Sequence, residues 1–170
     1  AARNVSSAST SPGRVHRSTP VRSRTVRSTC RRFGAPRTTA VAKARGWQIT
    51  QVLNTHEHHD HTGGNDAVIA ATGAKLIAHH RAGRSIPGVD RGVKAGDVVK
   101  VGKTVELECM DTPGHTMCHI CLRSHTEQPA LFSGDTLFNA GAGNCHNGGD
   151  PVALYTTFVD QLARLPENTL

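Results

Sequence analysis

Four side chains that commonly bind metal ions occur within six residues of this sequence: His56, His58, Asp60 and His61. They directly follow an apolar stretch that is typical of a strand. In extended backbone, residues i and i+2 project to the same side, so His56 and His58 can approach one ion. If a helix follows, Asp60 and His61 come round to a second position nearby. Imidazole and carboxylate ligands suit zinc, iron or manganese.

Two later motifs fit the same site. Residues 112–116 (TPGHT) place His115 on a tight turn after a strand, and residues 133–136 (SGDT) place Asp135 at the end of another. Either motif alone is weak, because a turn histidine and a Gly-Asp pair are common at protein surfaces. Together with the histidine run they supply ligands from three strand ends. His59 and Glu57 fall outside the alternation, so we expect them to point away from the metal.

The remaining patterns predict an α/β protein whose ordered part starts near residue 40. The expected strands are residues 48–54, 75–78, 97–101, 104–110, 119–123 and 129–133. The expected helices are the end of one at 40–45, a short one at 66–72 closed by Gly73, and one that Asp150 and Pro151 open. Leu154, Phe158, Leu162 and Leu165 form one apolar stripe along that last helix, which Pro166 ends. Residues 79–96 are predicted to be a surface connection.

The positive charge of the chain is concentrated at its start. The net charge is +7 over 170 residues, but residues 1–39 alone carry nine Arg and no acidic residue, and the rest sums to −2. This distribution argues against a nucleic-acid partner for the folded part. The sequence contains no apolar run of signal-peptide or transmembrane length, so we expect a soluble protein with no membrane partner. Its five cysteines are expected to be reduced thiols.

Residues 1–39 have three possible interpretations. They could be an organellar transit peptide, a disordered basic tail, or a segment that is not native to the fold because of a reading-frame error. We expect this segment not to pack on the domain, which then comprises residues 40–170. The expected compartment is the cytoplasm, or the mitochondrion if residues 1–39 are a transit peptide.

The motifs together resemble the metallo-β-lactamase superfamily, and longer strings resemble its glyoxalase II family, the hydroxyacylglutathione hydrolases. These strings are residues 55–65 (THEHHDHTGGN), 112–120 (TPGHTMCHI) and 132–143 (FSGDTLFNAGAG). The resemblance implies an αββα sandwich, expected to be incomplete at both ends of this chain. It also implies hydrolysis of S-(2-hydroxyacyl)glutathione to a 2-hydroxy acid and glutathione.

The resemblance further implies a centre of two divalent metal ions, zinc in the first place and iron or manganese as alternatives. His56, His58 and His115 would hold the first ion, Asp60 and His61 the second, and Asp135 would bridge them. A hydroxide between the metals would attack the thioester carbonyl, and Asp60 would orient it.

The sequence departs from the family pattern in three places. The opening strands of the family, and the last ligand of its second metal with the helical domain beyond, have no counterpart here. The Lys and Tyr that hold glutathione in the family match Asn144 and His146, so these are candidate substrate-binding residues and the thiol carrier could differ. Two alternatives stay open: a persulfide dioxygenase with one iron at the counterparts of His56, His115 and Asp135, and an inactive truncated paralogue.

Overall fold

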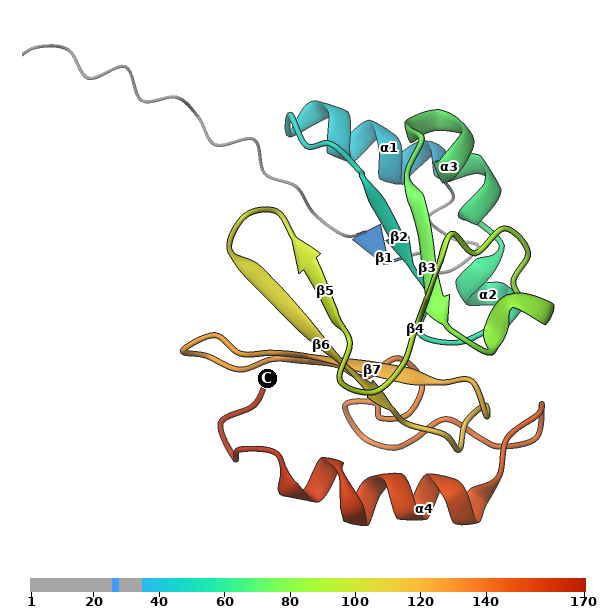
Figure 1. Ribbon diagram of the computed structural model, residues 1–170, viewed down its shortest axis with the longest axis vertical. Helices are drawn as coiled ribbons and strands as arrows, with labels where there is room; N and C mark the ends of the chain where they lie inside the picture. Colours follow the sequence, from blue (N-terminus) through green and yellow to red (C-terminus); the bar gives the residue numbers. More distant parts are fainter. Residues whose placement is uncertain (1–25, 28–34) are drawn as a thin grey trace, which may run out of the picture.

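The computed structural model describes residues 26–27 and 35–170 of the chain, and they form two four-stranded sheets that face each other (Figure 1). The first sheet is parallel, in the order β1 (Val26–Arg27), β2 (Gln51–Leu53), β3 (Lys75–His79), β4 (Arg91–Val93). The second is antiparallel, in the order β5 (Val98–Val101), β6 (Val105–Asp111), β7 (Ile120–Ser124), β8 (Leu131–Phe132).

Helices cover the outer face of each sheet (Figure 1). Helices α1 (Ala35–Ala44) and α3 (Asn65–Thr72) lie on the first sheet, and α4 (Pro151–Asp160) lies on the second. The shorter elements are α2 (His59–Thr62) and the 3-10 turns η2 (Ala82–Arg84) and η3 (Leu162–Arg164). The layer order is therefore the αββα sandwich that the sequence predicted.

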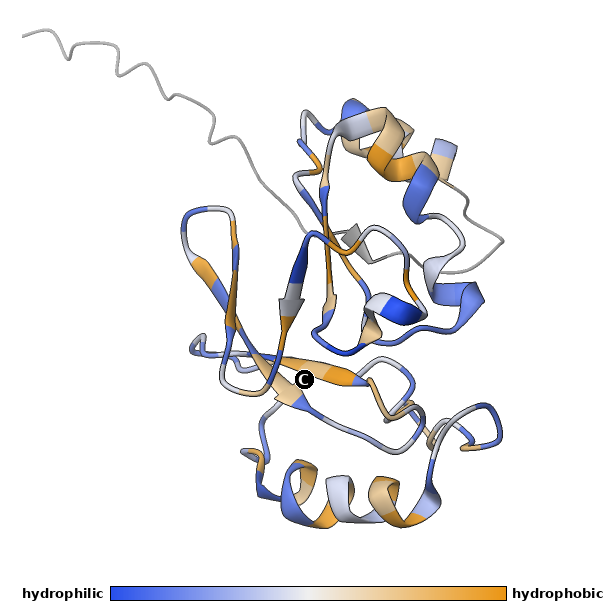
Figure 2. Cartoon of the chain, turned by 45° about the vertical axis from the view of Figure 1, so that its right-hand side comes forward, coloured by the Kyte–Doolittle hydropathy of each residue, from blue (hydrophilic) through white to orange (hydrophobic). Residues whose placement is uncertain are grey.

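The two central strands of the first sheet, β2 and β3, place apolar side chains on both faces because both faces are covered. In β2, Val52 packs under the helices and Leu53 points toward the second sheet; in β3, Leu76 and Ile77 divide in the same way. This alternation follows from the two-residue period of a strand. Figure 2 shows the resulting apolar colouring of these strands.

The apolar cluster between the sheets holds the two halves of the molecule together. Its buried members are Leu53, Ile77, Val93, Val99, Leu107, Cys109, Ile120 and Leu122. Beside this cluster one backbone hydrogen bond crosses from sheet to sheet: the Ile120 amide donates to the Thr55 carbonyl (2.8 Å). The end of β2 and the start of β7 are therefore held in fixed register where the sequence predicts the metal site.

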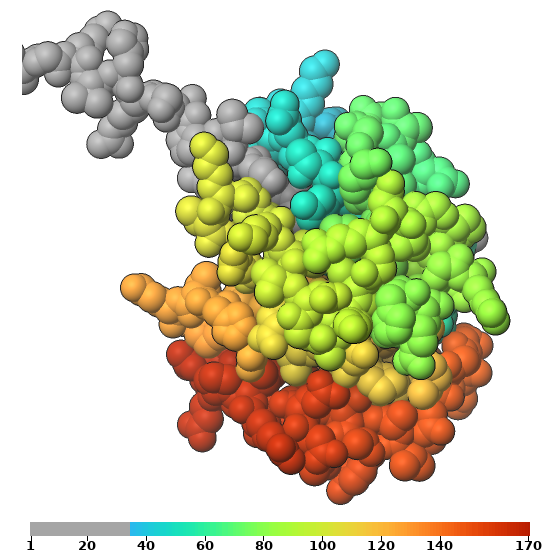
Figure 3. All heavy atoms as spheres, in the orientation of Figure 1, coloured from blue at the N-terminus to red at the C-terminus, as the bar shows by residue number. Residues whose placement is uncertain are grey.

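Helix α4 starts as the sequence predicted. The Asp150 carboxylate accepts from the Ala153 amide (2.8 Å), and Pro151 occupies the first turn. Thr157 and Gln161 then donate to the carbonyls of Pro113 (2.8 Å) and Asp111 (2.8 Å), which fastens the helix to the loop after β6. Figure 3 shows the C-terminal residues, in orange and red, as a continuous layer along one side of the molecule.

The described structure differs from the sequence prediction at two places. Helix α1 begins at Ala35, which is buried, and β1 pairs with β2, so the ordered part does not begin at residue 40. The basic composition of residues 1–39 gave no sign of this helix. A helix can pack with a single apolar stripe, and here the buried residues of that stripe are only Ala35 and Ala42. The rest of residues 1–39, namely 1–25 and 28–34, lies outside the described residues, and for it the expectation stays a prediction.

Strand β4 lies inside the predicted surface connection at residues 79–96. It is only three residues long and contains a glycine, so it has no recognisable period. Its pairing with β3 and the complete burial of Val93 in the inter-sheet cluster stabilise it, and neither is visible in the local sequence. Helix α4 also ends at Asp160, with η3 continuing as a tighter turn. No described helix is long and apolar enough to cross a membrane.

Candidate metal centre

The histidine run is held in place by two buried asparagines at its ends. Asn54 directly follows β2, and Asn65 begins α3; the side-chain Nδ2 of Asn65 donates to Asn54 Oδ1 (2.7 Å). Asn54 Nδ2 also donates to the His61 carbonyl (3.0 Å), and the chain turns into α2 immediately after His58. This fixed loop directs His56, His58 and His61 toward the second sheet.

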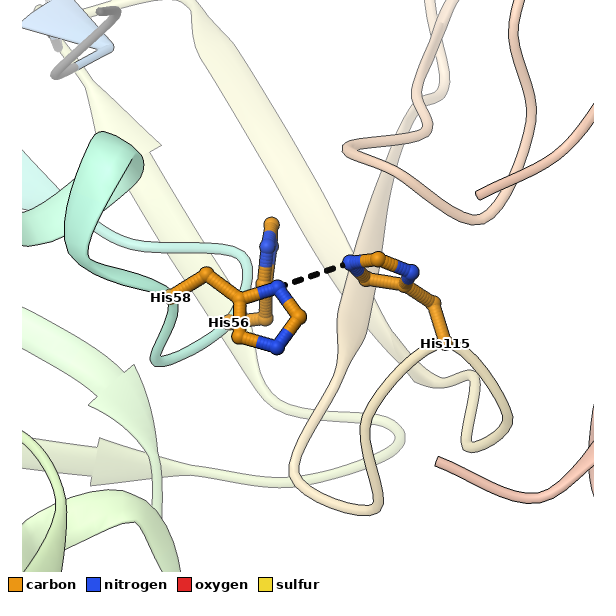
Figure 4. A group of neighbouring side chains, drawn as sticks. All are labelled: His56, His58 and His115. Carbon is orange, nitrogen blue, oxygen red and sulfur yellow. Dashed lines mark hydrogen bonds between the residues drawn. The ribbon is translucent and has the colours of Figure 1, made fainter. Parts of the chain in front are cut away.

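Three imidazoles form a first group, His56, His58 and His115 (Figure 4). One ligand atom from each lies within 4.8 Å of the others. His56 and His58 follow β2 of the first sheet, whereas His115 lies on the turn between β6 and β7 of the second. His58 Nδ1 and His115 Nε2 lie 3.0 Å apart.

Backbone carbonyls of one loop settle which nitrogens of these rings carry hydrogen. Asn144 O lies 2.5 Å from His115 Nδ1, and Asn147 O lies 3.0 Å from His58 Nε2. A carbonyl only accepts, so both of these ring nitrogens are donors. In the neutral rings, His58 Nδ1 and His115 Nε2 then present lone pairs to each other. Two lone pairs at 3.0 Å repel, and a cation between them removes that repulsion.

His56 supplies the third donor nitrogen of the first group. Its Nε2 is buried and has no hydrogen-bond partner, while its Nδ1 lies 3.1 Å from Thr55 Oγ1. Burial, together with the charges of the surrounding imidazoles, lowers the pKa of His56 to about 2. The ring is therefore neutral, which is the form that binds a metal. The three donor atoms fit a divalent ion such as zinc.

A second group combines His56, His61 and Asp135. Asp135 Oδ1 lies 3.2 Å from His61 Nε2, and Asp135 Oδ2 lies 3.8 Å from His115 Nε2. One carboxylate thus faces both groups. Asp60 is in neither group; its carboxylate is 64% exposed and borders the second group, with Oδ2 3.5 Å from His61 Nε2.

Residues 33–170 match the sequence model of the metallo-beta-lactamase superfamily. The chain belongs to the metallo-β-lactamase superfamily. It is 84% identical over 134 residues to a hydroxyacylglutathione hydrolase of Polaromonas sp. strain JS666, covering 79% of this chain and 51% of that protein. The chain spans about half the length of the curated relatives it matches.

Solved structures of the superfamily share this fold. ETHE1 from Myxococcus xanthus superposes with a TM-score of 0.72 at 25% identity, covering 83% of this chain and 60% of that one. TTHA1623 in a di-iron-bound form superposes with a TM-score of 0.63 at 25% identity, covering 78% and 72%.

The structure does not bring the two candidate substrate residues into either metal group of this superfamily member. Both Asn144 and His146 are exposed, and Asn144 Oδ1 accepts from the His146 amide (3.0 Å), which closes a local turn. The loop that carries them nevertheless touches the centre, through the carbonyls of Asn144 and Asn147. A role in substrate binding therefore stays a prediction for both side chains.

Glu57 and His59 lie outside both groups, as expected from the alternation. Glu57 Oε2 accepts from Thr116 Oγ1 (2.9 Å). Among the described residues, Cys118 and Cys121 belong to neither group. The sequence reasoning missed the Asn54–Asn65 pair and the buried imidazole of His119 beside the two groups. The second histidine of the TPGHTMCHI string was the available signal for His119.

Proposed function

We propose that this chain carries a centre of two divalent metal ions, zinc in the first place, and hydrolyses the thioester of a 2-hydroxy acid with glutathione. The Asp135 carboxylate carries the proposal, since one oxygen faces His61 and the other faces His115. The high identity to a hydroxyacylglutathione hydrolase supports the substrate class, and the di-iron form of a solved relative supports a pair of ions.

The residues divide between the two ions as the family resemblance implies. His56, His58 and His115 would hold the first ion, and Asp60 and His61 the second, with Asp135 facing both sets of ligands. Bound divalent ions of this kind polarise a carbonyl oxygen and lower the pKa of water, which gives a nucleophile at neutral pH.

The protein side chains then position the reacting groups. Asp60 is exposed at the first turn of α2, beside His61 Nε2, where its free carboxylate oxygen can orient the attacking water and hold its proton. The sulfur leaves as a thiolate when the acyl carbon–sulfur bond breaks. The exposed His146 lies on the loop that contacts His58 and His115, so we assign the thiol carrier to this side of the centre.

The test is steady-state hydrolysis by the zinc-loaded chain of S-lactoylglutathione and of lactoyl thioesters of other thiols. We expect chelator-sensitive hydrolysis, retained in His59→Ala and lost in His115→Ala. Hydrolysis that favours another thiol would change the proposed carrier but keep the reaction. No hydrolysis with zinc, iron or manganese would overturn the proposal and leave the inactive paralogue.

The alternative of a persulfide dioxygenase is measured in the same samples. The iron-loaded chain is given glutathione persulfide, and oxygen consumption is recorded. Oxygen uptake without thioester hydrolysis would replace the proposed function. The residues after Asp135, Thr136-Leu137-Phe138, favour the hydrolase, because the dioxygenases differ there, and so does the 84% identity to a hydroxyacylglutathione hydrolase over 134 residues.

A further inference from the structure

A fifth imidazole, His119, lies buried beside the four of the metal centre and belongs to neither group. Its side chain is 1% exposed, and its ring stacks on that of His56 with centroids 5.1 Å apart and planes 21° apart. A buried histidine can serve only to fill space in the core. Its hydrogen bonds argue for a more specific role.

The bond to Asp135 fixes the hydrogen positions on the His119 ring. The Asp135 amide donates to His119 Nε2 (3.2 Å), and an amide N–H cannot accept, so Nε2 carries a lone pair. The hydrogen of the neutral ring is then on Nδ1. This atom lies 2.9 Å from Thr112 Oγ1 and 3.0 Å from Thr136 Oγ1, both completely buried.

The hydroxyl of Thr112 continues the chain of bonds. Thr112 Oγ1 donates to Cys121 Sγ (3.3 Å), so its oxygen is free to accept from His119 Nδ1. Cys121 Sγ in turn donates to the Ser133 carbonyl (3.4 Å). The chain therefore begins at the Asp135 amide and ends at Ser133. Both ends of the tripeptide 133–135 are therefore hydrogen-bonded to one connected set of buried side chains, with Cys121 at Ser133 and His119 at Asp135.

The residue between those ends must be small. Gly134 has a φ of 54°, and a Cβ added there would lie 2.7 Å from both His119 Nε2 and Thr55 Oγ1. The backbone thus approaches the ring directly, with no side chain intervening. This contact leaves little freedom for the peptide that carries the Asp135 carboxylate.

We propose that His119 is a positioning residue, whose Nε2 lone pair holds the Asp135 amide so that the carboxylate lies between the two metal groups. The inference rests on the proposed two-metal centre. The role belongs to the Nε2 acceptor and not to the bulk of the ring. Only the acceptor sets the direction of the peptide at residues 133–135.

Two neutral substitutions separate these roles. In His119→Gln, the amide oxygen can reach the place of Nε2 and accept from Asp135. In His119→Asn, the amide nitrogen can reach the place of Nδ1 and serve the threonines, but nothing accepts from Asp135. His125→Gln is the matched control, because His125 is an exposed histidine paired with Glu108 at the surface.

The metal-free proteins are titrated with Co²⁺, and the absorption bands of the bound ion report each site. We expect two equivalents to bind in the unsubstituted chain, His119→Gln and His125→Gln. In His119→Asn the second equivalent should bind about 10–100-fold more weakly. Wild-type binding of both ions in His119→Asn, or equal losses in both His119 variants, would overturn the inference. Fewer than two ions in the unsubstituted chain would instead overturn the two-metal centre, and the inference with it.

A second measurement needs no variant. Long-range nitrogen-15 histidine spectra of the metal-free protein distinguish the two neutral tautomers. We expect the signal of His119 to show hydrogen on Nδ1 and none on Nε2. The opposite tautomer would overturn the inference even if a His119 variant failed to fold.

Discussion

His58 Nδ1 lies 3.0 Å from His115 Nε2, although 57 residues separate the two histidines and each comes from a different sheet. The opposite nitrogen of each ring donates to a carbonyl of the same loop, at Asn144 and Asn147. The loop thus points both lone pairs at one place. An ion bound there links the two sheets, and this link leads to the first prediction.

Removing the metal should destabilise the whole domain. An ion that binds the folded but not the unfolded chain stabilises it by about 4 kcal/mol at a free concentration of about 1,000 Kd. We expect a chelator to lower the unfolding free energy in urea by about this amount, and added zinc to restore it. Coincident unfolding curves with chelator and with zinc would contradict the site.

Replacing a first-group histidine should abolish tight metal binding. In His115→Ala, one of three donor nitrogens is gone, and we expect affinity for the first ion to fall by more than about 100-fold, since even an outer partner costs about 10–100-fold. His59→Ala is the control, because His59 belongs to the same run but to neither group. Competition with a chromophoric chelator gives both values. Equal affinities in the two variants would refute the assignment.

Gly143→Ala should disturb the centre without touching a ligand. A Cβ at Gly143 would lie 2.3 Å from the Asp135 carbonyl oxygen and 2.5 Å from His115 Nδ1. We expect a loss of about 1–3 kcal/mol of stability and weaker zinc binding, because the loop must move away from His115. Gly83→Ala, where a Cβ meets nothing within 4 Å, should change stability by less than about 0.5 kcal/mol. Unfolding of both zinc-loaded variants in urea tests this contrast.

Buried His79 should make the protein less stable in mild acid. Burial lowers the pKa of His79, the charges of His80 and Arg81 act in the same direction, and the Asp111 carboxylate offsets part of the shift. The unfolded chain therefore takes up a proton below about pH 6.5 that the folded chain resists. Stability is complete above that pH and falls as the pH decreases, by at most about 1.4 kcal/mol per unit for this group.

The measurement compares metal-free wild type with His79→Gln between pH 4 and 8. The variant cannot take up this proton, so its stability should fall less steeply below pH 6.5. Parallel curves over the whole range would show that His79 does not contribute to the slope.

Short-range patterns in the sequence predicted much of the architecture. Gly73 has a φ of 68° and closes α3, and Asp150 and Pro151 begin α4, because caps depend on one or two residues. Strand β4 could not be predicted this way. Its three residues are stabilised by pairing with β3 and by burial of Val93, which depend on parts of the chain distant in sequence.

The same distinction applies to the site. The spacing of His56 and His58 predicted their convergence, since i and i+2 share a side of extended backbone. The carbonyls of Asn144 and Asn147 could not be found, because any residue type offers a carbonyl. The side chain of Asn144 accepts from the His146 amide, whereas the contact with His115 comes from the main chain of Asn144.

The hydrogen bond from Ile120 to Thr55 gives the molecule a built-in probe of its own opening. This amide is bonded across the two sheets, so it can exchange its hydrogen for deuterium only when the sandwich separates at the metal centre. The other amides of β6 and β7, which pair within one sheet, can stay protected during that event. The exchange rate of a single amide, at Ile120, therefore counts the excursions in which His56 and His119 come apart, without any label at the site itself.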